Sequence, residues 1–230
     1  MSFLGVLMLQ TRFPRVPGDV GHAASFAMPV RHRVVRGASP QRVVRERDAT
    51  LLAPFIAAAQ GLVDEGASAI TTSCGFLVHF QQAMQDALAV PVWTSSLLQL
   101  RELHRPGVLT VDAASLSASH LVAAHAPPDT PVAGLRPGCH LQRVLLDDLP
   151  ELDTTQAERD VVHAALHLQA QHPRIECIVL ECTNLPPYAQ AVQGATGLPV
   201  HHLMSFVHRR WQVLSLDRLS HEENDMHGLT

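Results

Sequence analysis

Two cysteines stand where a thiol could act as an acid or a base on a bound substrate. Cys74 comes two residues after the apolar segment Ala67 to Thr72, and Cys182 directly follows the apolar segment Ile175 to Glu181. Thiols placed on opposite sides of a carbon acid can remove a proton from one face and deliver one to the other. Cys74 and Cys182 are therefore the candidate catalytic pair.

The surroundings of the two cysteines repeat along the chain. Cys74 and Cys182 each lie 17 residues before a proline, Pro91 and Pro199, and that proline sits inside a short apolar segment. The segment 107–111 (GVLTV) likewise resembles 5–9 (GVLML). We predict two similar lobes: residues 1–103, completed by a C-terminal helix at 204–217, and residues 104–203. A polar tail is expected at 218–230.

Apolar strands alternate with amphipathic helices, which favours an α/β fold with parallel sheets. We predict two similar Rossmann-like or flavodoxin-like lobes related by a pseudo-two-fold axis. Ligands of open parallel sheets bind outside the carboxyl ends of the strands, so the site is expected in the cleft between the lobes. Strands are expected at 5–9, 67–72, 90–93, 107–111, 175–181 and 198–200, and helices at 48–65, 77–88, from 95, and at 115–125, 154–171, 185–195 and 205–216.

Each candidate cysteine is expected just ahead of a helix N-terminus, where the helix dipole and free N–H groups lower a thiol pKa. Cys139 follows a Pro-Gly turn, and Cys177 lies within a predicted strand. We interpret both of these as buried structural cysteines, as most free cysteines are.

Composition excludes several classes of chemistry. All 17 basic residues are arginine, and without a lysine neither Schiff-base chemistry with pyridoxal phosphate nor a lysine-bearing P-loop is available. Aromatic residues make up 4% of the chain and no GxGxxG motif occurs, so no organic cofactor is expected. The 15 histidines are scattered, with no HExxH and no CxxC motif, so no metal is expected.

Charge and hydropathy also bear on partners and location. The net charge of −4 argues against nucleic-acid binding, although eight arginines lie between positions 12 and 47. Most of these are expected to be solvated, with Arg12 the best placed to meet an anionic substrate. No apolar run is long enough to span a bilayer, and we interpret 3–9 as a strand rather than a signal peptide. A reducing cytoplasmic location is therefore expected.

The segments 72–75 (TSCG) and 180–186 (LECTNLP) resemble the aspartate/glutamate racemase superfamily. That superfamily includes cofactor-independent amino-acid racemases, hydantoin racemase, maleate isomerase and arylmalonate decarboxylase. The resemblance implies two α/β lobes with the site between them and one catalytic cysteine from each lobe. A homodimer is a further hypothesis, since dimers are common in similar proteins.

The resemblance also implies a substrate site for a small carboxylate. Asn184 stands where glutamate racemases carry histidine, Gly75 where amino-acid racemases carry asparagine, and Gln10-Thr11 where they carry Asp-Ser. These departures argue against glutamate and aspartate as substrates. The decarboxylases lack the first cysteine, so Cys74 argues against decarboxylation. The expected substrate-binding residues are Gln10, Thr11, Arg12, Thr72, Ser73, Gly75, Thr183 and Asn184.

Three functions follow as hypotheses. The first is a racemase or epimerase of an amino acid or a derivative, in which Cys74 and Cys182 exchange a proton at the carbon next to a carboxylate. The second is a maleate-type cis–trans isomerase with a nucleophilic cysteine. The third is a non-catalytic ligand-binding or redox-sensing protein in which the two thiols form a reversible pair.

Overall fold

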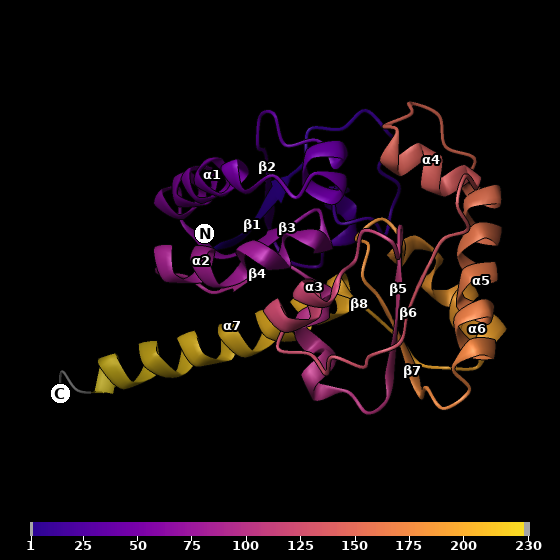
Figure 1. The fold of residues 1–230 in the computed structure, drawn as a ribbon. Helices are drawn as coiled ribbons and strands as arrows, with labels where there is room; N and C mark the ends of the chain where they lie inside the picture. The colour runs from indigo at the N-terminus through magenta and orange to yellow at the C-terminus, as the bar shows by residue number, and fades with distance from the viewer. Residues whose placement is uncertain (1, 228–230) are drawn as a thin grey trace.

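The computed structural model describes residues 2–227, and the side chains of residues 2–216. It contains two four-stranded parallel sheets, one in each lobe (Figure 1). The first is built from β1 (Phe3–Met8), β2 (Val30–Val34), β3 (Ala67–Thr72) and β4 (Val92–Trp93). The second is built from β5 (Pro106–Thr110), β6 (Val132–Gly134), β7 (Cys177–Leu180) and β8 (Val200–His202). The predicted two-lobe α/β fold is confirmed.

The two sheets share one strand order. It runs β2-β1-β3-β4 in the first lobe and β6-β5-β7-β8 in the second, with every pairing parallel. The central strands β1, β3, β5 and β7 are buried along their whole length, which explains their continuous apolar sequences. Because β3 and β7 hold equivalent positions, the residues that follow them occupy equivalent ends of the two sheets.

Helices cover the sheets. Their bounds are α1 (Leu52–Asp64), α2 (Gln81–Ala87), α3 (Ala118–Ala123), α4 (His140–Leu146), α5 (Thr154–Gln171), α6 (Ala189–Thr196) and α7 (Leu203–His227). α5 has the predicted bounds, and Asp153 caps it by accepting a hydrogen bond of 3.0 Å from Gln156 N. Gly66 has a φ of +98° just after α1, as its predicted role in ending that helix requires.

The last helix returns to the first lobe. Figure 1 shows α7 leaving the second lobe and running beneath the first. Leu203, Met204, Phe206 and Val207 of α7 pack in one buried cluster with residues of the first sheet, among them Leu4, Val6, Ala69 and Trp93. The helix extends beyond the predicted 205–216 and continues to His227. Of the predicted polar tail, residues 228–230 lie outside the described part of the chain.

Hydrogen bonds between buried groups join the lobes next to the strand ends. Thr183 Oγ1 donates to Ser73 O at 2.6 Å, and Ser96 Oγ donates to Leu180 O at 2.8 Å. The lobes are therefore held together where β3 and β7 end. None of the helices in residues 2–227 combines the length and apolar character that crossing a membrane requires.

Candidate active site

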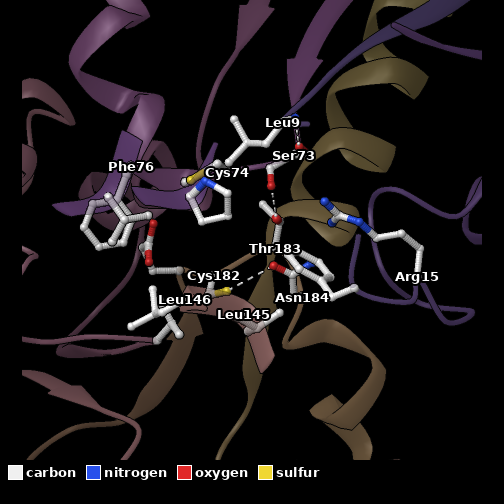
Figure 2. A pocket seen from close by; sticks show the side chains of 16 residues that line it. Leu9, Arg15, Ser73, Cys74, Phe76, Leu145, Leu146, Cys182, Thr183 and Asn184 are labelled. Atoms are coloured by element: carbon white, nitrogen blue, oxygen red, sulfur yellow. Dashed lines mark hydrogen bonds between the residues drawn. The ribbon is translucent and has the colours of Figure 1, made fainter. Parts of the chain in front are cut away.

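The two candidate cysteines face one cavity from opposite lobes. Cys74 follows β3 and precedes a 3₁₀ turn at Gly75–Phe80, and Cys182 follows β7. Both side chains line the same cavity, and Figure 2 shows the two sulfurs approaching it from different sides. The thiols are almost fully buried, with 9% and 8% of each residue exposed. All four cysteines of the chain are free.

The cavity is small and mostly apolar, with a volume of about 30 Å³. Loop residues of the first lobe and residues of α4 complete its walls. Its lining consists of Leu9, Phe13, Arg15, Pro40, Val44, Ser73, Cys74, Gly75, Phe76, Val111, Leu145, Leu146, Glu181, Cys182, Thr183 and Asn184. A lining of this kind, apolar with a few convergent polar groups, is typical of a small-molecule site, and the walls must move apart to admit an organic substrate.

The cavity holds both thiols in their neutral form, contrary to the predicted lowering of their pKa values. Burial, with a smaller contribution from the Glu181 carboxylate, raises the pKa of Cys74 to about 12. The same two causes raise the pKa of Cys182 well above its usual range. Backbone N–H groups oppose this at both residues, but desolvation of a fully buried thiolate outweighs them. A bound cation would act in the opposite direction.

Glu181 is a buried carboxyl between the two thiol-bearing segments. It is fully buried, and its Oε2 accepts a hydrogen bond of 2.6 Å from Thr110 Oγ1. Its Oε1 has no hydrogen-bond partner among the described residues. Burial raises the pKa of this carboxyl to about 7. Gly75 makes room for it, because a Cβ at that position would lie 2.5 Å from the Glu181 carbonyl oxygen and would overlap Oε1.

A polar network from the first lobe supports Asn184. Asn184 Nδ2 donates to Asp19 Oδ2 at 2.5 Å, and Asn184 Oδ1 accepts from the Cys182 thiol at 3.6 Å. Asp19 also pairs with Arg15, whose Nη1 lies 3.1 Å from Asp19 Oδ1. Arg15 in turn donates to Thr11 Oγ1 at 3.1 Å. This largely buried network fixes the orientation of the Asn184 amide.

Four of the eight predicted substrate-binding residues line the cavity: Ser73, Gly75, Thr183 and Asn184. Hydroxyl groups among them are already engaged, since Thr183 donates to Ser73 O and Ser73 Oγ accepts from Leu9 N at 2.9 Å. Their first role in this structure is thus to hold the two lobes and β1 in register.

The other four predicted residues are not among those that line the cavity. Gln10 accepts a hydrogen bond from Gly37 N, and Thr72 donates to Thr94 O at 2.7 Å. Thr11 accepts from Arg15. Arg12 pairs with Asp148 and its side chain is 70% exposed.

Two charged residues of the cavity are not found by sequence reasoning. Arg15 belongs to the arginines that are expected to be solvated, and its spacing of four from Asp19 is the only signal of a pair. Glu181 reads as the end of a strand, although a charged residue between Leu180 and Cys182 breaks an otherwise apolar run. A charge in a buried strand is costly unless it has a role.

The remaining cysteines lie away from the cavity. Cys139 precedes α4, and the Cys177 thiol donates to His104 O at 3.7 Å. Both are buried, and neither is among the cavity residues. Within residues 2–227, no group of three or more His, Cys, Asp or Glu side chains is placed to hold a metal ion.

Solved structures with the same two-lobe architecture include several enzymes. Glutamate racemase from Bacillus anthracis matches with a TM-score of 0.62 and 16% identity, covering 94% of this chain and 82% of that one. Unliganded arylmalonate decarboxylase matches with a TM-score of 0.58 and 19% identity, covering 87% of both chains. This is the fold of the aspartate/glutamate racemase superfamily, as the cysteine motifs predicted.

The sequence relatives are more specific. Dimethylsulfoniopropionate lyase of Durusdinium sp. clade D is 32% identical over 213 residues, covering 86% of this chain and 70% of the relative. Dimethylsulfoniopropionate lyase 6 of Emiliania huxleyi is 33% identical over 218 residues, covering 86% of this chain and 56% of the relative. The chain belongs to the dimethylsulfoniopropionate lyase family. It spans little more than half the length of the Emiliania relative, and no family model matches it.

Proposed function

We propose that this chain is a lyase that cleaves dimethylsulfoniopropionate, or a close β-sulfonio carboxylate, by 1,2-elimination. The observation that carries the proposal is its 32% identity to a lyase of that name over 86% of the chain. The part of the chain that lies outside this match is shorter than the segment before Cys74 and shorter than the segment after Cys182. Both thiols therefore lie inside the matched region.

The proposed elimination begins with the same step as racemisation by a thiol and then continues to cleavage of a C–S bond. A thiolate removes a proton from the carbon next to the carboxylate, as in a racemase. In dimethylsulfoniopropionate the next carbon carries a dimethylsulfonium group. The electron pair of the broken C–H bond forms the carbon–carbon double bond, and the C–S bond breaks with its electrons on sulfur. The products are acrylate, neutral dimethyl sulfide and a protonated thiol.

A cationic substrate suits the protonation state of the two cysteines. Both thiols are neutral because of burial and the nearby Glu181 carboxylate. A sulfonium group next to them favours the thiolate, since an opposite charge lowers a thiol pKa. The substrate thus helps to create the base that attacks it. Elimination needs one base for the proton, and the second thiol is left to contact the reacting atoms from the other lobe.

Racemisation or epimerisation next to a carboxylate is the second candidate function. It is favoured by the presence of two thiols on opposite sides of one cavity, the arrangement that proton removal and return on opposite faces requires. A lyase acting on a methylene carbon has no stereocentre to invert, so substrate choice separates the two functions.

The deciding experiment offers the reduced protein dimethylsulfoniopropionate and, separately, a panel of amino acids, hydantoins and maleate in deuterated water. We expect dimethylsulfoniopropionate to yield acrylate, detected by NMR, and dimethyl sulfide, detected by headspace gas chromatography. Deuterium entering a Cα position of the panel with formation of the other enantiomer, and no acrylate, would replace the lyase by the racemase. Absence of acrylate from a folded, reduced protein overturns the lyase proposal.

A further inference from the structure

One end of the cavity carries a carboxyl oxygen that nothing satisfies. Glu181 is fully buried, and Thr110 holds its Oε2 while Oε1 has no partner among the described residues. A buried polar atom without a partner costs free energy, so a group that satisfies it would be stabilised there. Oε1 lies against Gly75, where a Cβ would not fit, and the apolar side chains of Phe76 and Leu146 line the same cavity.

The guanidinium of Arg15 also lines the cavity and also has a buried atom without a hydrogen-bond partner among the described residues. The Arg15 side chain is 13% exposed, and its Nη1 and Nη2 bond to Asp19 and Thr11. Its Nε is buried and has no partner in the part of the chain that the structure describes. Since Arg is always protonated, this N–H is a charged donor available to an anion.

The two unsatisfied groups lie on different sides of the thiols. Figure 2 shows Arg15 on one side of Cys74 and Cys182 and Phe76 on the other. Glu181 Oε1 lies against Gly75, the residue before Phe76. Both charges reach Cys74, because Arg15 lowers its pKa and Glu181 raises it. The cavity is thus polar at two ends, with opposite sign, and carries the thiols between them.

We propose that the cavity recognises a zwitterion, with the substrate carboxylate at Arg15 Nε and a methylated cationic head group at Glu181 Oε1. This rests on the proposed function, because a β-sulfonio carboxylate carries these two charges. A sulfonium or quaternary ammonium group has no N–H or O–H to satisfy, so a single carboxylate oxygen among apolar side chains is sufficient. Glu181 is then the residue that determines specificity for the cation, and the substrate carbons lie beside the thiols.

The test uses two probes of one shape that differ in charge. The first is 3-(trimethylammonio)propionate, and the second is its carbon isostere 4,4-dimethylpentanoate. Binding to the reduced protein is measured by calorimetry at about pH 8, where a carboxyl with a pKa of about 7 is ionised. We expect the wild type to bind the ammonium probe at least roughly tenfold more tightly, since opposite charges in a buried site attract strongly.

Variants assign that preference to its residue. Glu181→Gln keeps the shape of the side chain and is expected to bring the two probes within about twofold of each other. Thr110→Ser keeps the carboxyl and the hydroxyl donor that lowers its pKa, and it is expected to retain the preference, which controls for altered packing. Arg15→Lys keeps a charge beside Asp19 but removes the Nε donor. It is expected to weaken the binding of both probes by a similar factor.

Outcomes of this test are separate from those of the lyase assay. Equal binding of the two probes to the wild type, or binding of neither, overturns the inference even if acrylate is formed. A preference that persists in Glu181→Gln overturns the role of Glu181. A preference that is lost in Glu181→Gln supports the inference even in a protein that yields no acrylate, in which case only the proposed reaction fails.

Discussion

The side-chain amide of Asn184 in the second lobe donates a 2.5 Å hydrogen bond to Asp19 in the first lobe, and this turns its carbonyl oxygen toward the Cys182 thiol. Asp19 is 2% exposed and also pairs with the largely buried Arg15. One carboxylate therefore orients an amide beside a candidate catalytic thiol and balances the charge of a cavity arginine.

Asp19→Asn tests this network. Removing one member of a buried ion pair leaves the other charge uncompensated, so we expect a loss of about 3–5 kcal/mol in the free energy of unfolding. The exposed pair between Arg45 and Asp147 supplies the control, and Arg45→Gln is expected to cost less than about 1 kcal/mol. Urea denaturation of both variants gives the comparison. Similar losses in the two would contradict a special role for the buried pair.

The four cysteines should separate into two classes. Of Cys74→Ser and Cys182→Ser, the variant that replaces the base is expected to lower the rate of acrylate formation by about 10²–10⁴-fold, the usual contribution of a positioned base, and the other variant is expected to lower it by a smaller factor. Cys177→Ser provides the matched control, since its thiol donates to His104 O and a hydroxyl can do the same. Its activity should stay within about threefold of wild type. Full activity in either of the first two variants would remove that thiol from the mechanism.

Gly75→Ala is expected to disturb both stability and activity. Its Cβ would lie 2.5 Å from the Glu181 carbonyl oxygen and closer still to the carboxyl oxygen. We expect a cost of about 1–3 kcal/mol in the free energy of unfolding, together with loss of substrate binding. Gly194→Ala in α6 is the control, because a Cβ added there would meet no atom within 4 Å and alanine favours a helix. It should be neutral or slightly stabilising.

Glu181 gives the protein a specific dependence of stability on pH. Burial raises its pKa from 4.5 to about 7 in the folded state, so the folded protein binds this proton more tightly than the unfolded chain. Its contribution to stability is greatest below about pH 4.5 and falls as the pH rises through 7, by about 3 kcal/mol at most. The thiols of Cys74 and Cys182, which face it, stay neutral over this range.

Comparing the wild type with Glu181→Gln between about pH 5 and pH 8 isolates this effect, because glutamine does not titrate. We expect the wild type to lose stability relative to the variant across this interval. Parallel stability curves would show that the carboxyl has the same pKa in the folded and unfolded states.

Helices with clear helical spacing of apolar residues, and strands that are wholly apolar, could be predicted from the sequence. α5 has helical spacing and a capping aspartate, and its bounds were predicted correctly. The central strands were found because both of their faces are buried. The edge strands β2 and β6 were missed, since β2 reads VRHRV and is only partly buried, while β6 has three residues. Val30–Val34 is therefore a strand that local composition concealed.

The same reasoning explains what was found of the site. The repeat around Cys74 and Cys182 predicted the two residues that share a cavity from different lobes. Arg15 and Glu181 could not be chosen in this way, because their importance depends on burial created by distant segments. Thr110, which donates a hydrogen bond to Glu181, lies 71 positions from it in sequence. Asp19, which pairs with Arg15, also accepts a hydrogen bond from Asn184, 165 positions away.

The packing of α7 on the first sheet has a consequence for synthesis of the chain. Translation proceeds from the N-terminus, so Leu4, Val6 and Trp93 leave the ribosome long before the helical residues Leu203 to Val207 that cover them. One apolar face of the nascent first lobe stays open while the whole second lobe is made. A chain cut short after β8 would keep both cysteines and still expose that face, so it is expected to aggregate or to recruit chaperones.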